Sequence, residues 1–328
     1  MAHFGRCFAS FASLGLNQNL VMDIFLQQII NGLTLGSVYA IVALGYTMVY
    51  GIIQLINFAH GELVMIGAMV AFSVIHLLAQ TPLPPVLIVL AGILAAVPVC
   101  MLVGYTMERV AYRPLRSAPR LAPLITAIGI SIILQHLAML IWSRNPLAFP
   151  QIIPLVRFNV GGAIITGVQI AIILTSVLMM AALTLMVYRT KLGIAMRATS
   201  QNPQVAGLMG IDINQVISFT FIVGAGLAAV AGVMVGTYYG IAHYGMGSLL
   251  GMKAFAAAVL GGIGNLAGAM LGGVLLGIVE ALGAGYIGDL TNNVFGSNYQ
   301  DVFAFMVLIA VLVFRPSGLL GERVGDRA

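Results

Sequence analysis

Residues 31–68 read NGLTLGSVYAIVALGYTMVYGIIQLINFAHGELVMIGA, and stretches of this composition decide the fold class. Apolar runs of about 20 residues recur along the chain, and each is long enough to cross a hydrocarbon layer about 30 Å thick. The runs lack strict two-residue alternation, and backbone polar groups cannot stay unpaired in lipid, so they predict helices and not barrel strands. The sequence therefore predicts an all-α polytopic membrane protein.

The composition of the whole chain points the same way. Hydrophobic residues make up 61% of the 328 residues and charged residues 7%, with a mean hydropathy of +1.07. A soluble domain carries about 25% charged residues. The net charge of +5 arises from basic residues in the breaks between apolar runs, so it does not indicate nucleic-acid binding. The two cysteines, Cys7 and Cys100, give no disulfide framework.

We expect about eight transmembrane helices and one half-length or re-entrant helix. The eight spans are predicted at 24–50, 63–79, 84–107, 121–142, 163–188, 214–238, 266–287 and 299–314. The half-length apolar segment is predicted at 252–263. Residues 1–21 support a signal peptide poorly. They are interpreted as an N-terminal extension, unstructured or due to a misassigned start, because the stretch after Met22 already reads as the start of a membrane protein. Residues 22–328 are predicted to form a single transmembrane domain.

The distribution of basic residues predicts the orientation. Ten of the 14 Lys and Arg residues lie on one side if the spans alternate. These are Arg109, Arg113, Arg116, Arg120, Arg189, Lys191, Arg197, Arg315, Arg323 and Arg327. The positive-inside rule makes that side the cytoplasm, with the N-terminus outside and the C-terminus inside. This arrangement needs an odd number of crossings, which a half helix turning back in the glycine-rich stretch 259–268 would supply.

The break at 189–211, RTKLGIAMRATSQNPQVAGLMGI, contains its own short helix. Asn202 can cap it, Pro203 suits its first position and Gly210 is a natural stop. Its apolar face consists of Val205, Ala206, Leu208 and Met209. About two turns are too few to be stable alone in water, so the helix needs a surface. That surface is either the lipid headgroups or a cytoplasmic partner, for which the last two apolar residues would be anchors.

The stretch NFAHGE, residues 57–62, is unusually polar for its surroundings. Asn57, His60 and Glu62 bring three polar side chains to a place with little soluble loop, and Gly61 permits a sharp or unwound backbone. Ionisable residues inside a membrane mark either a pathway or a paired structural site. Two interpretations stay open: a role in translocation or gating, and a pairing of His60 with Glu62 near the headgroups that fixes a bend.

Glycines at a four-residue spacing predict close helix packing in the predicted span 266–287 and just before it. They are Gly264, Gly268, Gly272, Gly273 and Gly277. Packing within one subunit is the leading interpretation, and an interface between subunits is the alternative. Glu280, late in the same span, is expected to extend toward the headgroups.

Several further motifs occur in order along the chain. They are QVAGLMG (204–210), INFAHGE (56–62), KLGIAMRAT (191–199), LMGID (208–212), AFAAAVLGGIGNLAGAMLGG (254–273) and RPSGLLG (315–321). Together they resemble the permeases of ABC importers for branched-chain amino acids, over nearly the whole chain from Met22 onward. In QVAGLMG, Ala206 and Gly210 match the coupling-helix loop of such permeases, while Gln204 and Val205 replace the usual Glu and Ala.

The resemblance implies an H-type permease subunit that translocates Leu, Ile or Val across the bacterial cytoplasmic (inner) membrane. It implies as partners a homologous M-type permease or a second copy of the chain, two cytoplasmic ABC ATPases, an extracytoplasmic amino-acid-binding protein and membrane lipid. It implies no nucleic acid. The helix at 202–210 would then transmit the motion of the ATPases to the membrane spans.

The motifs that the chain lacks bear on its energy source. Neither lysine follows a glycine, so there is no phosphate-binding P-loop. No metal-ligand cluster and no nucleophile–base set is visible. We therefore expect that this chain is not an enzyme and binds no metal or cofactor, and that partner subunits bind ATP and Mg²⁺. The same importer architecture for urea, short amides or other amino acids remains an alternative, as does an ion-coupled secondary transporter acting alone.

Overall fold

The computed structural model describes residues 18–116, 118–119, 121–154, 156–290 and 299–321, and this part of the chain is almost entirely helical. Its α-helices are α2 (Gln18–Ile53), α3 (His60–Leu78), α4 (Pro85–Met107), α5 (Leu121–Ile141), α6 (Gly167–Arg189), α7 (Lys191–Gln201), α8 (Pro203–Leu208), α9 (Ile213–Tyr239), α10 (Met246–Gly261), α11 (Leu266–Leu290) and α12 (Gln300–Phe314). A π-helical turn, η1 (Glu108–Tyr112), and a 3₁₀ turn, η2 (Arg113–Leu115), extend α4.

Seven helices of the described part are long and apolar enough to cross a membrane, which confirms the predicted all-α polytopic fold. The two remaining apolar helices, α10 and α12, are shorter. They correspond to the predicted half-length segment and to the predicted last span. The predicted extension, residues 1–21, lies outside the described residues, except that 18–21 begin α2.

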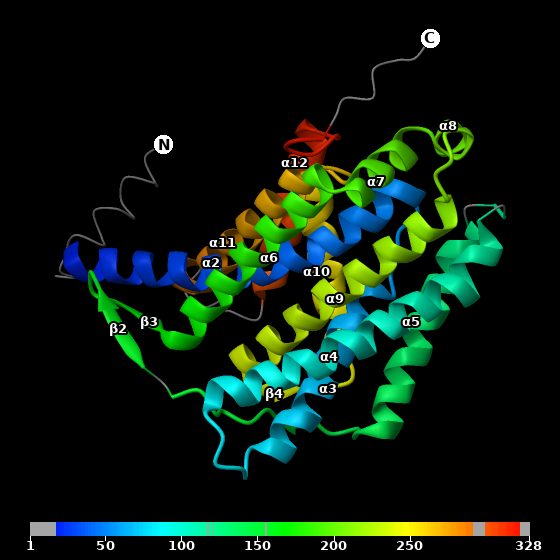
Figure 1. Ribbon diagram of the computed structural model, residues 1–328. Helices are drawn as coiled ribbons and strands as arrows, with labels where there is room; N and C mark the ends of the chain where they lie inside the picture. Colours follow the sequence, from blue (N-terminus) through cyan, green and yellow to red (C-terminus); the bar gives the residue numbers. More distant parts are fainter. Residues whose placement is uncertain (1–17, 117, 120, 155, 291–298, 322–328) are drawn as a thin grey trace.

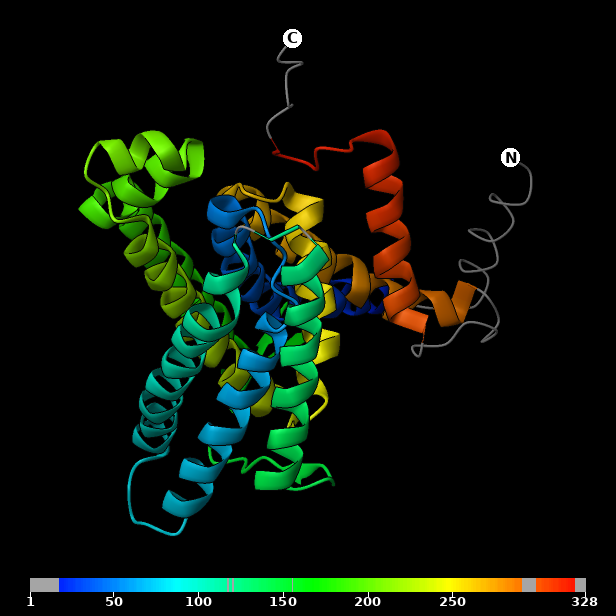
Figure 2. The same cartoon turned by 90° about the vertical axis from the view of Figure 1, so that its right-hand side faces the viewer.

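The helices form one interlocked bundle (Figure 1). α2 packs closely against α11, while α3, α4 and α9 contact one another, and α10 lies against α2, α3 and α11. α5 contacts mainly α3, and α12 contacts mainly α11 (Figure 2). The best-buried long spans are α2 and α9, at 78% and 83% of their apolar windows, whereas that of α5 is 11% buried.

α10 contacts the start of α3 at one end and leads into the turn before α11 at the other. α3 starts at His60 after an irregular segment that follows the end of α2, and its first turn meets the first turn of α10. α10 ends at a turn in which Gly262 and Gly264 have φ values of 106° and 96°. α11 then runs back along α10. This turn falls within the glycine-rich stretch in which the sequence predicts a break.

Two short antiparallel strand pairs lie at the end of the molecule away from α8 (Figure 1). β1 (Leu147–Ala148) pairs with β4 (Ile241–Ala242), and β2 (Arg157–Val160) pairs with β3 (Ala163–Thr166). The span predicted from residue 163 therefore begins too early. Thr166 instead caps α6, because its side chain and that of Gln169 form a reciprocal capping box.

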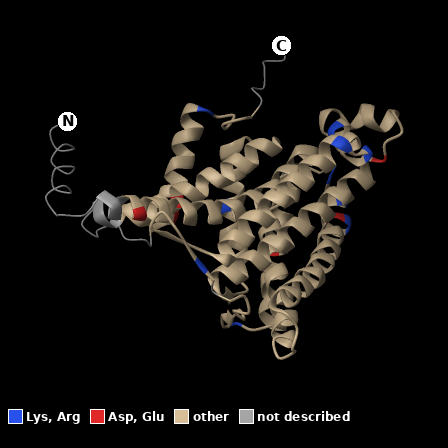
Figure 3. Ribbon diagram, turned by 60° about the vertical axis from the view of Figure 1, so that its left-hand side comes forward, with Lys and Arg blue, Asp and Glu red and all other residues tan. Residues whose placement is uncertain are grey.

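Basic residues gather at the end of the molecule that carries α7 and α8, which we call the basic end (Figure 3). The described segments at this end are η1, η2, the end of α6, α7 and the residue after α12, and their basic residues are Arg109, Arg113, Arg116, Arg189, Lys191, Arg197 and Arg315. Arg120, Arg323 and Arg327, predicted for the same side, lie outside the described residues. The segments that contain Arg144 and Arg157 lie toward the opposite end.

Candidate functional site

A pair of short helices projects from the basic end (Figures 1 and 2). Thr190 caps α7 by accepting a hydrogen bond from the Gly193 N–H at 3.1 Å. Asn202 then caps α8 by accepting one from the Val205 N–H at 3.1 Å, and Pro203 occupies the first helical position. The sequence predicts α8 but misses α7, for which the Thr190 cap was the available signal.

The larger apolar side chains of α8, and that of Met209 directly after it, point away from the protein. Leu208 is 87% exposed, Met209 79% and Val205 52%, and we call these three residues the docking surface. Ala206, the buried residue of α8, is 3% exposed. Gly210, with φ of 85°, ends the segment. A helix of this length that shows its larger apolar side chains to the outside needs a partner surface.

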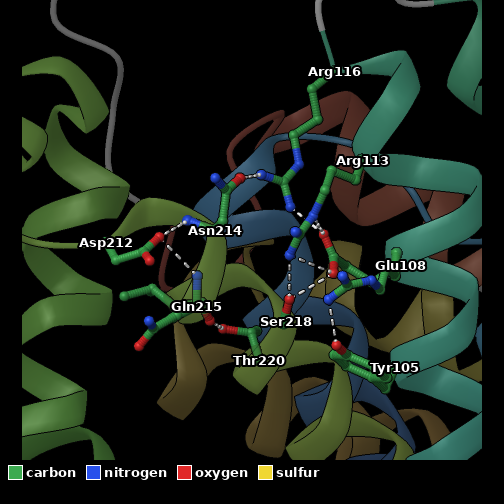
Figure 4. Close-up of polar contacts among 11 residues, drawn as sticks. Tyr105, Glu108, Arg113, Arg116, Asp212, Asn214, Gln215, Ser218 and Thr220 are labelled. Carbon is green, nitrogen blue, oxygen red and sulfur yellow. Dashed lines mark hydrogen bonds and ion pairs between the residues drawn. The ribbon is translucent and has the colours of Figure 1, made fainter.

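The first turn of α9, directly after α8, is fixed by polar contacts (Figure 4). Asp212 caps α9, and its Oδ1 accepts hydrogen bonds from the Asn214 and Gln215 N–H groups at 2.9 and 3.2 Å. The Asn214 Oδ1 accepts one from the Arg116 guanidinium at 2.7 Å. Ser218 donates to Glu108 at 2.6 Å. The start of α9 is therefore tied to the residues that follow α4.

Glu108 is the centre of this network, which we call the arginine clamp: Glu108, Arg113, Arg116, Asn214 and Ser218. Its carboxylate is fully buried and pairs with Arg113 at 3.4 Å and with Arg116. Burial lowers the pKa of Arg116, and the neighbouring Glu108 carboxylate opposes that shift. The π-helical turn places Glu108 among these partners, and π turns are frequent at functional sites. The sequence indicates the arginines as orientation signals only, so it misses the clamp.

Asn57 links the irregular segment before α3 to the same region. Its Oδ1 accepts hydrogen bonds from the Ala59 N–H at 3.1 Å and from the Tyr112 hydroxyl at 2.7 Å. His60 lies deeper. Its ring packs edge-on against Tyr46 at 4.7 Å between centroids and comes so close to Gly45 that a Cβ there would lie 2.3 Å from Nε2.

Glu62 does not pair with His60, so the proposed pairing that fixes a bend is wrong. Glu62 instead turns toward α5, where its Oε1 accepts hydrogen bonds from Ser131 at 2.9 Å and from Gln135 at 2.7 Å. The interpretation of Gly61 also needs correction. It lies within α3, and a Cβ there would come 2.3 Å from the Gly247 carbonyl oxygen, so Gly61 serves close approach to α10 and not an unwound backbone.

A buried ion-pair group joins three helices that the sequence treats separately. Lys253 of α10 lies 2.7 Å from Glu280 of α11 and 2.6 Å from Asp301 of α12, and it donates to the Tyr39 hydroxyl at 3.4 Å. Glu280 is fully buried, so its expected extension toward the headgroups is wrong. A single lysine inside an apolar run was the available signal, because such a charge needs an opposite partner.

Four of the five singled-out glycines lie at close helix contacts within the chain. A Cβ on Gly277 would lie 2.2 Å from the Gly36 backbone nitrogen, and one on Gly273 would lie 2.5 Å from Ala40. Gly268 and Gly272 pack on α10 in the same way. Gly264 differs, because it has positive φ and nothing lies within 4 Å of an added Cβ. Its role is in the backbone turn before α11 and not in helix packing.

Comparison with known proteins adds a family to this geometry. Residues 28–312 match the family described as "Branched-chain amino acid transport system / permease component". The chain is 50% identical over 303 residues to the high-affinity branched-chain amino acid transport system permease protein BraD of Pseudomonas aeruginosa, covering 91% of this chain and 96% of the relative. It is 45% identical over 308 residues to the corresponding permease protein LivH of Escherichia coli K12, covering 91% and 96%.

A more distant relative matches over a similar length. The probable branched-chain amino acid transport permease protein LivH of Methanocaldococcus jannaschii is 28% identical over 308 residues, covering 92% of this chain and 95% of the relative. No solved structure matches the chain.

Proposed function

Because the chain belongs to the family of branched-chain amino acid transport permeases, we propose that it is the membrane-spanning subunit of an ATP-driven importer for leucine, isoleucine and valine. Relatives at 45–50% identity carry names for high-affinity transport of these amino acids, which favours them over urea or short amides. The membrane in question is the bacterial inner membrane. The chain provides the path, and ATP is hydrolysed elsewhere.

The docking surface is the observation that carries the proposal. Leu208 and Met209 are more than three-quarters exposed at the end of a short helix at the basic end. An amphipathic helix that presents apolar anchors suits a groove in a partner protein. Under this proposal the basic end faces the cytoplasm, so the C-terminus is inside and the N-terminus outside. The partner that provides the groove is then a cytoplasmic ATPase.

The arginine clamp explains how movement of α8 would reach the membrane spans. Only the short segment 209–212 separates α8 from α9, and Asp212 caps α9. The clamp joins the start of α9 to the end of α4 through Asn214, Ser218 and Glu108. A push on α8 therefore moves α9 and α4 together as a rigid unit, which is a usual form of switching between two packings.

The remaining subunits of the proposed importer are those that the family resemblance implies. Two ATPases, which bind ATP and Mg²⁺, would lie against the docking surfaces of two permeases. The second permease would be a homologous M-type chain or another copy of this one. An amino-acid-binding protein would deliver the substrate at the end that carries the strand pairs. This chain itself would bind no nucleotide.

The proposal is tested by replacing both docking anchors with aspartate. The Leu208→Asp/Met209→Asp variant should lose the ATPase from complexes purified in mild detergent, because two charges enter an apolar groove. A matched control is Phe158→Asp/Val160→Asp, which alters two exposed apolar residues, 49% and 57% exposed, on β2. The control should keep the ATPase. Recovery of ATPase with the docking variant at the level of the unaltered chain would contradict the proposal.

A further inference from the structure

Three glutamates are buried in the part of the chain that the structure describes, and one of them differs from the others. Glu108 pairs with two arginines and Glu280 pairs with Lys253. Glu62 is also fully buried, but within the described residues no Lys, Arg or His nitrogen lies within 4.0 Å of its carboxylate. A buried carboxylate without a cation is energetically costly, so the missing partner of Glu62 needs an explanation.

The contacts of Glu62 leave half of its carboxylate unused. Oε1 accepts the hydrogen bonds from Ser131 and Gln135, whereas Oε2 accepts none. Oε2 lies beside the first turn of α10, where a Cβ on Gly247 would come within 2.6 Å of it. The carboxylate is therefore oriented by α5 on one side, and its free oxygen is directed toward α10.

The helix that covers Glu62 is the least buried of the long spans. α5 contacts mainly α3. Its Ala127 and Ala138 are buried, while Ile125 and Leu140 are 66% and 77% exposed. A small displacement of α5 would expose Glu62 while breaking few packing contacts. The two polar residues on the covering face of α5 are the same ones that bind Oε1.

We propose that Glu62 binds the α-ammonium group of the transported amino acid during its passage through the permease. The inference rests on the proposed function and names a contact for it. An ammonium group would donate a charge-assisted hydrogen bond to the free Oε2 and supply the missing cation, while Ser131 and Gln135 hold the carboxylate in place. Leucine, isoleucine and valine share this group, so the site recognises the amino acid and not its side chain.

A purely structural role for Glu62 makes a different prediction. A protonated, neutral carboxyl group would only form hydrogen bonds with Ser131 and Gln135, and glutamine has nearly the same shape and keeps the side-chain oxygen that accepts both bonds. Glu62→Gln therefore separates the two roles. An ammonium site needs the negative charge, whereas a neutral hydrogen-bonding group does not. The exchange Glu62→Gln/Gln135→Glu moves the carboxylate to the other side of a 2.7 Å contact, so the site still holds one negative charge.

The test uses the complete importer, with ATPase, second permease and binding protein, reconstituted in vesicles. Initial rates of leucine uptake are measured over a range of leucine concentrations. Glu62→Gln should lower kcat/KM for uptake by about 30-fold or more, as is usual when one partner of a buried charge pair is removed. The exchanged double variant should recover most of the loss. Asp23→Asn removes a carboxylate near the start of α2 and should leave uptake unchanged.

The outcomes distinguish this inference from the proposed function. If the unaltered importer takes up leucine with ATP and Glu62→Gln does so equally well, the ammonium site is wrong and the importer stands. If the unaltered importer shows no ATP-driven leucine uptake, both are wrong. If Glu62→Gln does not assemble, the double variant decides: an assembled double variant that transports supports the site, and one that is assembled but inactive overturns it.

Discussion

Single residues of this chain are predictable where their effect is local. Asn202 and Pro203 mark the start of α8 because capping and the missing proline N–H act within one turn. The sequence does not reveal the role of Gly61, because a glycine can supply either an unusual backbone angle or a close approach. In the structure Gly61 is helical and touches α10.

Gly277 provides a prediction at this scale. Gly277→Ala should lower the stability of the purified protein by about 1–3 kcal/mol, because an added methyl group must separate two helix backbones. The atom that it would meet is the Gly36 nitrogen at 2.2 Å, which cannot rotate away. Thermal unfolding in detergent measures the effect. Gly129→Ala is the control, since nothing lies within 4 Å of its added Cβ. Equal midpoints for the two variants would contradict this packing.

Elements are predictable from apolar length, and their ends are less so. The sequence predicts the long spans because each must bury its backbone polar groups in lipid. It misses α7, which is amphipathic and lies outside the spans, and it places the start of α6 within the β2–β3 hairpin. The arginine clamp could not be predicted either, because Glu108 and Ser218 are 110 residues apart in sequence. Only the packing of α4 against α9 brings them together.

The arginine clamp predicts a coupling defect. Glu108→Gln should lower the number of leucine molecules transported per ATP hydrolysed by about 10-fold, because α9 and α4 no longer move as one unit. The measurement compares leucine uptake with phosphate release in the reconstituted importer. Arg109→Gln is the control, since Arg109 follows Glu108 directly and its guanidinium donates to Tyr105, outside the clamp. A transport-to-hydrolysis ratio for Glu108→Gln equal to that of the control would refute a role in transmission.

The whole molecule joins these parts into one path from the docking surface to the interior. α8 leads to α9, α9 is clamped to α4, and α9 crosses α3 where Gly232 meets Val64. α3 carries Glu62 in its first turn. The family and the fold class could be predicted from the sequence, because motifs and apolar runs are linear features. The ion pairs of Lys253 with Glu280 and Asp301 could not, since they depend on how α10, α11 and α12 pack.

The measurement that tests the central claim most directly is leucine uptake into vesicles that contain this chain and its co-purified partners. We predict uptake that requires ATP on the side of the membrane that the basic end faces. Uptake should persist when a protonophore removes the proton gradient, and it should stop in the Leu208→Asp/Met209→Asp variant. Uptake by this chain alone, without ATP and abolished by the protonophore, would contradict the account and identify a secondary transporter instead.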